Sequence, residues 1–160
     1  MALVEKYRTI IEEHAAGAAA IAIPGSFVPV IDVAGVAGIW TNMLVKIAKK
    51  SGQDISHQFI GKFATSVASG VSGYILGSKI FGMLLHLIPG VGTLVYIGIN
   101  GFLNYMFTYR LGKMTSGLME RKDFDLSDLS NLVTQVVAPL VAIPSVSEAM
   151  EIIKSAKGIS

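Results

Sequence analysis

The sequence predicts an all-α protein, a helical bundle of about six helices around a central apolar hairpin rich in small residues. Apolar residues recur every three or four positions along most of the chain, and no segment sustains the alternation of a strand. Hydrophobic residues make up 52% of the 160 residues and charged residues only 15%, against about 25% charged in an average globular chain. We expect a single helical domain over residues 1–160.

The N-terminal segment, residues 1–23, predicts an amphipathic helix that continues into an Ala-rich stretch. Leu3, Tyr7 and Ile10 fall on one face of that helix, and charged residues fill the other face. Pro24 then opens a turn segment, because a proline disfavours helix at the residue before it.

A second helix is expected over residues 29–51. Pro29 suits the first turn of a helix, and Asp32 suits its start, where a carboxylate can cap backbone N–H groups and is favoured by the helix dipole. Asp32 could also be a functional acid in an apolar stretch, but a helix cap is the more common role. Gly52 predicts the stop.

Residues 55–118 predict the apolar hairpin, with Asp54 or Ser56 as the cap of its first helix. Small residues recur there every fourth position, which lets two helix backbones approach closely. We predict a helix–helix seam from one such row: Ser69, Gly73 and Gly77. A tight turn should join the two helices of the hairpin through three residues: Pro89, Gly90 and Gly92.

Residues 125–158 predict two C-terminal amphipathic helices. Pro139 and Pro144 should bound or kink the first. Ser145 and Glu148 have the spacing of a capping box, which predicts the start of the last helix.

The central segment, residues 80–109, contains no charged residue when His86 is neutral, and it exceeds the roughly 20 residues that span a bilayer. A membrane hairpin turning at Pro89 would bury Lys79 near the midplane, at a cost of about 2.5–3.5 kcal/mol. A single kinked span would leave Lys79 at its end, and a soluble bundle would bury the same helices as its core. Trp40 fits either a membrane interface or an ordinary core.

Catalytic, cofactor-binding and metal-binding residues are not predicted. The chain has no cysteine, which excludes thiolate chemistry and Cys-type zinc sites. His14 and His57 each neighbour a carboxylate, but the spacing matches no metal-ligand motif. The net charge of +2 is too small to indicate nucleic-acid binding.

Two stretches together carry a family resemblance. The first is IPGSFVPVID over residues 23–32, before a helix that ends in KKSG, and the second is LIPGVGT over residues 87–93. Over residues 15–115 the chain resembles the YcjF-like family of uncharacterised bacterial helical domains. That resemblance implies a membrane-associated domain that often accompanies a P-loop GTPase, and it implies structural roles for Pro24, Pro29, Asp32, Pro89, Gly90 and Gly92.

The sequence therefore favours a non-enzymatic, membrane-associated helical protein that anchors or assembles with a GTPase or with itself. Membrane lipid, a GTPase and a second copy of the chain are the expected partners. The expected location is the bacterial inner membrane or its cytoplasmic face, with a soluble cytoplasmic protein as the alternative. Two other functions stay open: a soluble carrier of an apolar ligand, and a pore-forming effector that inserts on a trigger.

Overall fold

The fold is known from a computed structural model that describes residues 5–22, 32–75, 94–125 and 129–158. Over these residues the structure is all-helical and contains no strand, which confirms the predicted fold class. The described elements are the 3₁₀ turn η1 (Glu5–Tyr7) and the helices α1 (Arg8–Ala20), α2 (Val33–Ser51), α3 (His57–Ile75), α5 (Leu94–Met119), α6 (Leu129–Val141) and α7 (Val146–Lys157).

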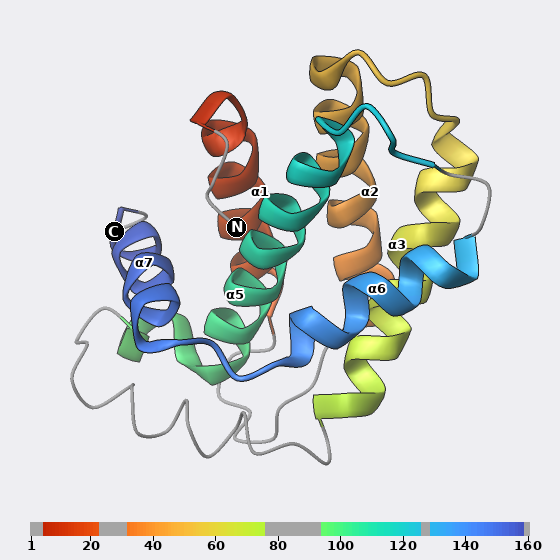
Figure 1. The fold of residues 1–160 in the computed structure, drawn as a ribbon. Helices are drawn as coiled ribbons and strands as arrows, with labels where there is room; N and C mark the ends of the chain where they lie inside the picture. Colours follow the sequence, from red (N-terminus) through yellow and green to blue (C-terminus); the bar gives the residue numbers. More distant parts are fainter. Residues whose placement is uncertain (1–4, 23–31, 76–93, 126–128, 159–160) are drawn as a thin grey trace.

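Helix α5 forms the centre of the bundle (Figure 1). It packs against α1 and α7 on one side and against α2 and α6 on the other. Every residue from 100 to 112 is buried, because this helix is apolar on all sides and neighbours cover it all round. The predicted second helix of the hairpin is therefore a core helix over the part of it that the structure describes.

The helix ends in the described segments follow local capping chemistry. Asp32 has extended backbone and its carboxylate accepts a hydrogen bond from Gly35 N–H, with 3.1 Å between Oδ1 and N. Helix α2 therefore begins at Val33 instead of at residue 29, and Asp32 is the cap that the sequence predicts. Gly52 ends α2 in the left-handed conformation, and the Ser56 hydroxyl caps α3 by accepting from Phe59 N–H.

Helices α1 and α5 cross closely. Ala15 and Ala18 of α1 are fully buried there, and a Cβ atom at Gly112 would lie only 2.7 Å from Ile11 Cγ1. The Ala-rich segment therefore serves close packing, and α1 ends at Ala20, three residues short of the predicted end.

Two buried hydrogen bonds fix α5 against its neighbours. Trp40 Nε1 donates to Thr108 Oγ1 at 2.7 Å, with both residues fully buried, so Trp40 is a core residue in this structure. Asn104 Nδ2 donates to Ala18 O at 2.9 Å. A buried polar group without a partner costs about 1–3 kcal/mol, so these pairs define how the helices fit together.

Helix α3 packs mainly on α2 and α6. Ala64 and Ala68 of α3 are buried. Gly70 lies close to α6, because a Cβ atom added at Gly70 would lie 3.1 Å from Val137 Cγ2. Ser69 and Gly73 of the predicted seam are exposed, and among the described residues no packing neighbour lies within 4 Å of a Cβ built at Gly73. A seam between two copies of the chain remains a prediction.

Candidate functional site

The most distinctive surface is the bend between α6 and α7, which we call the elbow and define as residues 139–150. Pro139 lies in the last turn of α6, where it bounds that helix as the sequence predicts. Pro144 is buried in the connection. The two helices meet at an angle of 89°.

Arg110 of α5 sets the position of the elbow from inside. Its side chain is only 7% exposed, and Nη1 donates to Leu140 O at 2.6 Å and to Ala142 O at 2.8 Å. Its Nε atom donates to Glu148 Oε1 at 2.8 Å. One guanidinium thus satisfies carbonyls at the C-terminal end of α6 and pairs with the first turn of α7.

Ser145 caps α7, because its hydroxyl accepts a hydrogen bond from Glu148 N–H at 3.2 Å. The sequence predicts this cap correctly, but the Glu148 carboxylate is directed to Arg110. In a full capping box that carboxylate would return to the backbone of Ser145. Here the buried Arg110 side chain is a stronger partner for the Glu148 carboxylate than the backbone N–H of Ser145 would be.

A second group of polar contacts lies one turn further along both helices. Lys113 Nζ lies 2.9 Å from Glu151 Oε2, and the Tyr109 hydroxyl donates to Glu151 Oε1 at 2.9 Å. Burial raises the pKa of Glu151, but the hydrogen bonds from Lys113 and Tyr109 outweigh it and hold that pKa below its usual value. Burial, together with the neighbouring carboxylate, raises the pKa of Tyr109. Glu151 therefore holds α7 to α5 as a carboxylate.

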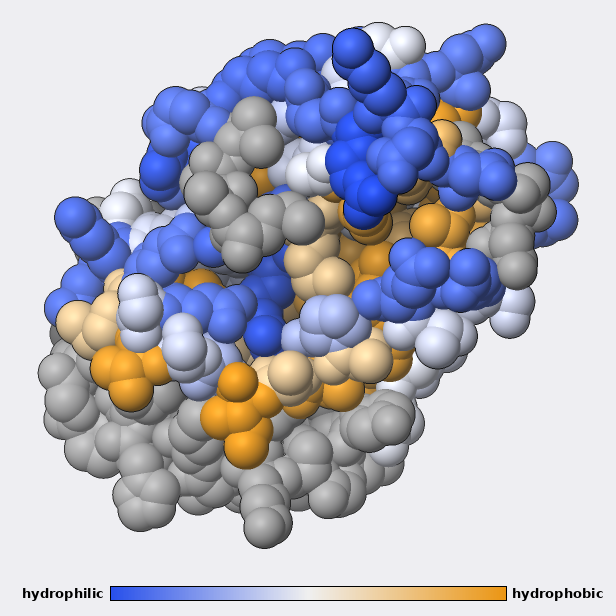
Figure 2. Space-filling view, viewed as in Figure 1, coloured by the Kyte–Doolittle hydropathy of each residue, from blue (hydrophilic) through white to orange (hydrophobic). Residues whose placement is uncertain are grey.

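The outer side of the elbow is apolar. Ile143, Val146 and Met150 are 58%, 83% and 59% exposed, and they are three of the four exposed large hydrophobic residues among those described. Figure 2 shows hydrophobic patches in the lower half of the coloured surface, on the side where Figure 1 places the elbow, while the upper part of the same face is mainly hydrophilic. The elbow therefore exposes an apolar surface on one end of the bundle.

Among the described residues, no individual helix is both long and apolar enough to cross a bilayer. Helices α6 and α7 taken together are long and apolar enough to cross a bilayer, but the chain bends sharply between them. The uncharged segment 80–109 falls partly outside the described residues.

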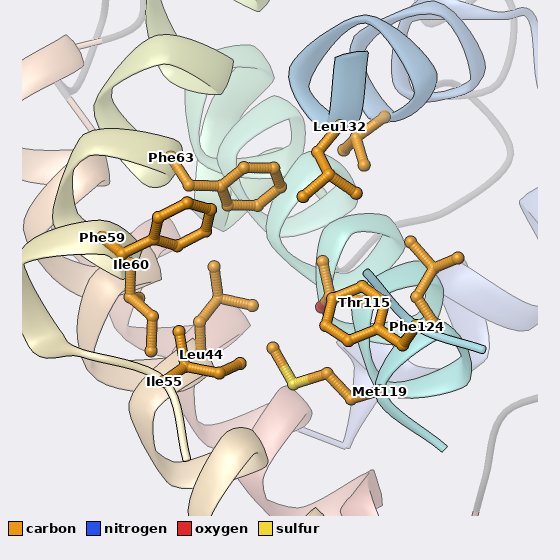
Figure 3. A pocket seen from close by; sticks show the side chains of 11 residues that line it. Leu44, Ile55, Phe59, Ile60, Phe63, Thr115, Met119, Phe124 and Leu132 are labelled. Atoms are coloured by element: carbon orange, nitrogen blue, oxygen red, sulfur yellow. The ribbon is translucent and has the colours of Figure 1, made fainter. Parts of the chain in front are cut away.

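An apolar cavity lies between α2, α3, α5 and α6 (Figure 3). Phe59 and Phe63 of α3 face Leu132, Phe124 and Met119 across it. Its free volume is about 20 Å³, which is room for about one water molecule. In this conformation the cavity is a packing gap and not a pocket for an apolar ligand.

The structure brings few of the predicted site residues together. Asp32 caps α2, and Ser69 and Gly73 lie on the outer face of α3. The remaining ones lie outside the described residues: Gly77, Pro24, Pro29, Pro89, Gly90 and Gly92.

The described part of the chain contains no group of three or more His, Asp or Glu side chains that could bind a metal ion. His14 is buried, with Nδ1 2.6 Å from Ile10 O, and His57 is exposed. Lys79 and His86 lie outside the described residues.

Sequence reasoning missed the pairing of α5 with α7. Arg110 and Lys113 follow the uncharged segment 80–109 in the sequence, and the structure buries them at 7% and 12% exposure. One signal was present: two basic residues three apart on one helix match two acidic residues three apart, Glu148 and Glu151, on another.

The fold and the elbow define an all-α protein with an exposed apolar bend. Among curated proteins, the chain is similar to magnetosome membrane protein 22 of Magnetospirillum gryphiswaldense, with 31% identity over 87 residues. The match covers 54% of this chain and 45% of the relative, so the aligned part is less than half the length of that protein. No family model matches the chain, and no solved structure matches it.

Proposed function

We propose that this chain is a non-enzymatic helical protein that associates with a membrane through its elbow. The observation that carries the proposal is the exposure of Ile143, Val146 and Met150 within eight positions of one another. Moving such side chains from water into an apolar medium is favourable by about 1–2 kcal/mol each, given their partial exposure. The membrane we expect is the bacterial inner membrane, from its cytoplasmic face.

The comparison supports this proposal, since the partial relative is named a membrane protein. The geometry supports association by the folded chain, because Ile143, Val146 and Met150 are exposed at the bend between α6 and α7, which Figure 1 places at one end of the bundle. An amphipathic element of this kind lies in the membrane interface and does not need to span the bilayer.

Sedimentation of the purified chain with lipid vesicles tests the proposal. We expect the wild-type chain to pellet with vesicles, and Val146→Ser with Met150→Ser to weaken binding by about 10-fold or more. Ile21→Ser is the matched control, because Ile21 is the fourth exposed large hydrophobic residue, 40% exposed and outside the elbow. Equal loss in both variants, or no binding by the wild type, would refute the proposal.

A carbonate wash of membranes from expressing cells separates two modes of association. Release by carbonate indicates association through the elbow, whereas retention indicates that a segment such as residues 80–109 inserts. A dye trapped in the vesicles reports in the same assay on the pore-forming alternative, which requires leakage.

The family resemblance and the row of small residues each add a further proposal. A P-loop GTPase would be a partner in trans, and an adjacent GTPase gene would support it. A second copy of the chain would pack along the row of Ser69, Gly73 and Gly77. The exposure of Ser69 and Gly73 in the folded chain supports that contact.

A further inference from the structure

Helix α7 presents a single outward stripe that changes from apolar to basic along its length. Val146, Met150, Lys154 and Lys157 follow a spacing of four, four and three residues, which places all four on one face of a helix. All four are exposed. The apolar pair lies at the elbow end, and the lysines lie in the last turn.

The acidic residues of α7 are directed away from that stripe. Glu148 pairs with Arg110 at 2.8 Å and Glu151 with Lys113 at 2.9 Å, both toward the central helix α5. The carboxylates of α7 are therefore paired toward α5, while Lys154 and Lys157 are exposed. The outward stripe carries apolar and basic side chains, and an apolar, negatively charged surface complements it.

We propose that this stripe binds the headgroups of anionic lipids, with the elbow inserted and Lys154 and Lys157 at the level of the lipid phosphates. This inference rests on the proposed membrane association and names the lipid class and the depth. At 1.5 Å per residue, Lys154 and Lys157 lie about 6 Å and 10 Å along the axis from Met150. An interfacial helix lies at the boundary of headgroups and acyl chains with its apolar face buried by about 5–10 Å, so the exposed lysines of the same helix lie close to the lipid phosphates when the elbow is inserted.

A lysine chain suits this position for a further reason. Its methylene stem can lie along apolar surface while the ammonium group stays with the headgroups. Each lysine close to an anionic leaflet strengthens binding by about 5-fold at moderate ionic strength, and the gain falls within a Debye length as salt rises.

The experiment compares vesicles of phosphatidylcholine alone with vesicles that also contain phosphatidylglycerol. We expect the wild-type chain to bind the anionic vesicles about 10- to 30-fold more tightly, and salt to remove most of the difference. Lys154→Glu with Lys157→Glu should remove the preference and leave the binding to neutral vesicles unchanged.

The matched control is Lys49→Glu with Lys50→Glu, which makes the same charge change at exposed lysines. Those residues lie at the end of α2, at the opposite end of the bundle from the elbow (Figure 1). Because Lys154 and Lys157 also stabilise the end of α7, Lys154→Gln with Lys157→Gln, checked by circular dichroism, is the second variant. It should lose the preference for anionic vesicles while keeping wild-type helix content.

The outcomes separate this inference from the proposed function. Equal binding to both kinds of vesicle, with loss on Val146→Ser and Met150→Ser, keeps membrane association and overturns the lipid preference. An equal effect of the α2 and α7 lysine changes also overturns it. Binding to neither kind of vesicle overturns both, and self-association lost on Met150→Ser would assign the stripe to a second copy of the chain.

Discussion

Arg110 shows how one side chain determines the geometry of the candidate site. It donates to two carbonyls at the end of α6 and pairs with Glu148 at the start of α7. Arg110→Met should lower the free energy of unfolding by about 2–4 kcal/mol, since it leaves a partly buried carboxylate and two carbonyls without donors. Urea denaturation followed by the fluorescence of Trp40, the single tryptophan of the chain, measures the change.

The double variant Arg110→Met with Glu148→Met tests the cause. Removing both charges leaves no unpaired carboxylate, so this variant should be more stable than Arg110→Met alone. Equal losses in the single and double variants would show that the ion pair does not hold the elbow.

Gly112 lies at the crossing of α1 and α5, where a side chain has little room. A Cβ there would lie 2.7 Å from Ile11 Cγ1 and 3.1 Å from Met43 Sδ. Overpacking costs about 1–3 kcal/mol, which exceeds the gain of about 1 kcal/mol in helix propensity. Gly112→Ala should therefore lower the stability by up to about 2 kcal/mol in a thermal or urea titration.

Gly38→Ala is the control for that substitution, because nothing lies within 4 Å of a Cβ at this helical position. It should raise the stability by up to about 1 kcal/mol. A stabilising effect of both substitutions would mean that the α1–α5 crossing is looser than the structure indicates.

Helix α7 is held to the bundle by buried apolar residues and by two ion pairs to α5. The pKa of Glu151 is lower in the folded chain than its usual value, so folding favours the carboxylate. A lowered pKa contributes stability that is present above the unfolded value of about 4.3 and is lost as the pH falls through the folded pKa. We expect acid to weaken the docking of α7 on α5.

Urea titrations at pH 7 and at about pH 3.5 measure this dependence. Glu151→Gln should lose less stability between the two pH values than the wild type does, because its amide does not titrate. Other carboxylates with lowered pKa values, such as Glu5 and Asp123, remain in both proteins and cancel in the comparison. An identical pH dependence in the two proteins would exclude Glu151 as a contributor.

The sequence predicts those features of the fold that depend on residues close together in the chain. Asp32, Gly52, Ser56 and Ser145 mark helix ends through side chains or backbone within three or four residues, and the structure confirms each. Arg110 and Glu148 are 38 residues apart. Their meeting depends on how α5 and α7 pack, which helical periodicity does not specify.

The difference between local and long-range interactions also explains which small residues the sequence could assign to helix contacts. Periodicity predicts that some rows of Gly, Ala and Ser permit close helix contacts, but not which row faces a neighbour. Within the described residues, Ala64 and Ala68 are buried and Gly70 and Gly112 make the close approaches, whereas Ser69 and Gly73 face outward. An outward row of small residues leaves a flat strip on which a second helix could pack.

That strip leads to a prediction about assembly. Gly73→Leu with Gly77→Leu should shift an oligomer of this chain to smaller species in size-exclusion chromatography and analytical ultracentrifugation. The isolated fold should tolerate the change at Gly73, because no packing neighbour among the described residues lies within 4 Å of its Cβ position and Leu forms helix better than Gly. Gly38→Leu is the control, since Gly38 lies on a different helix, α2, and its Cβ position is equally open among the described residues. If all three proteins elute alike, the row of Ser69, Gly73 and Gly77 is not an assembly seam.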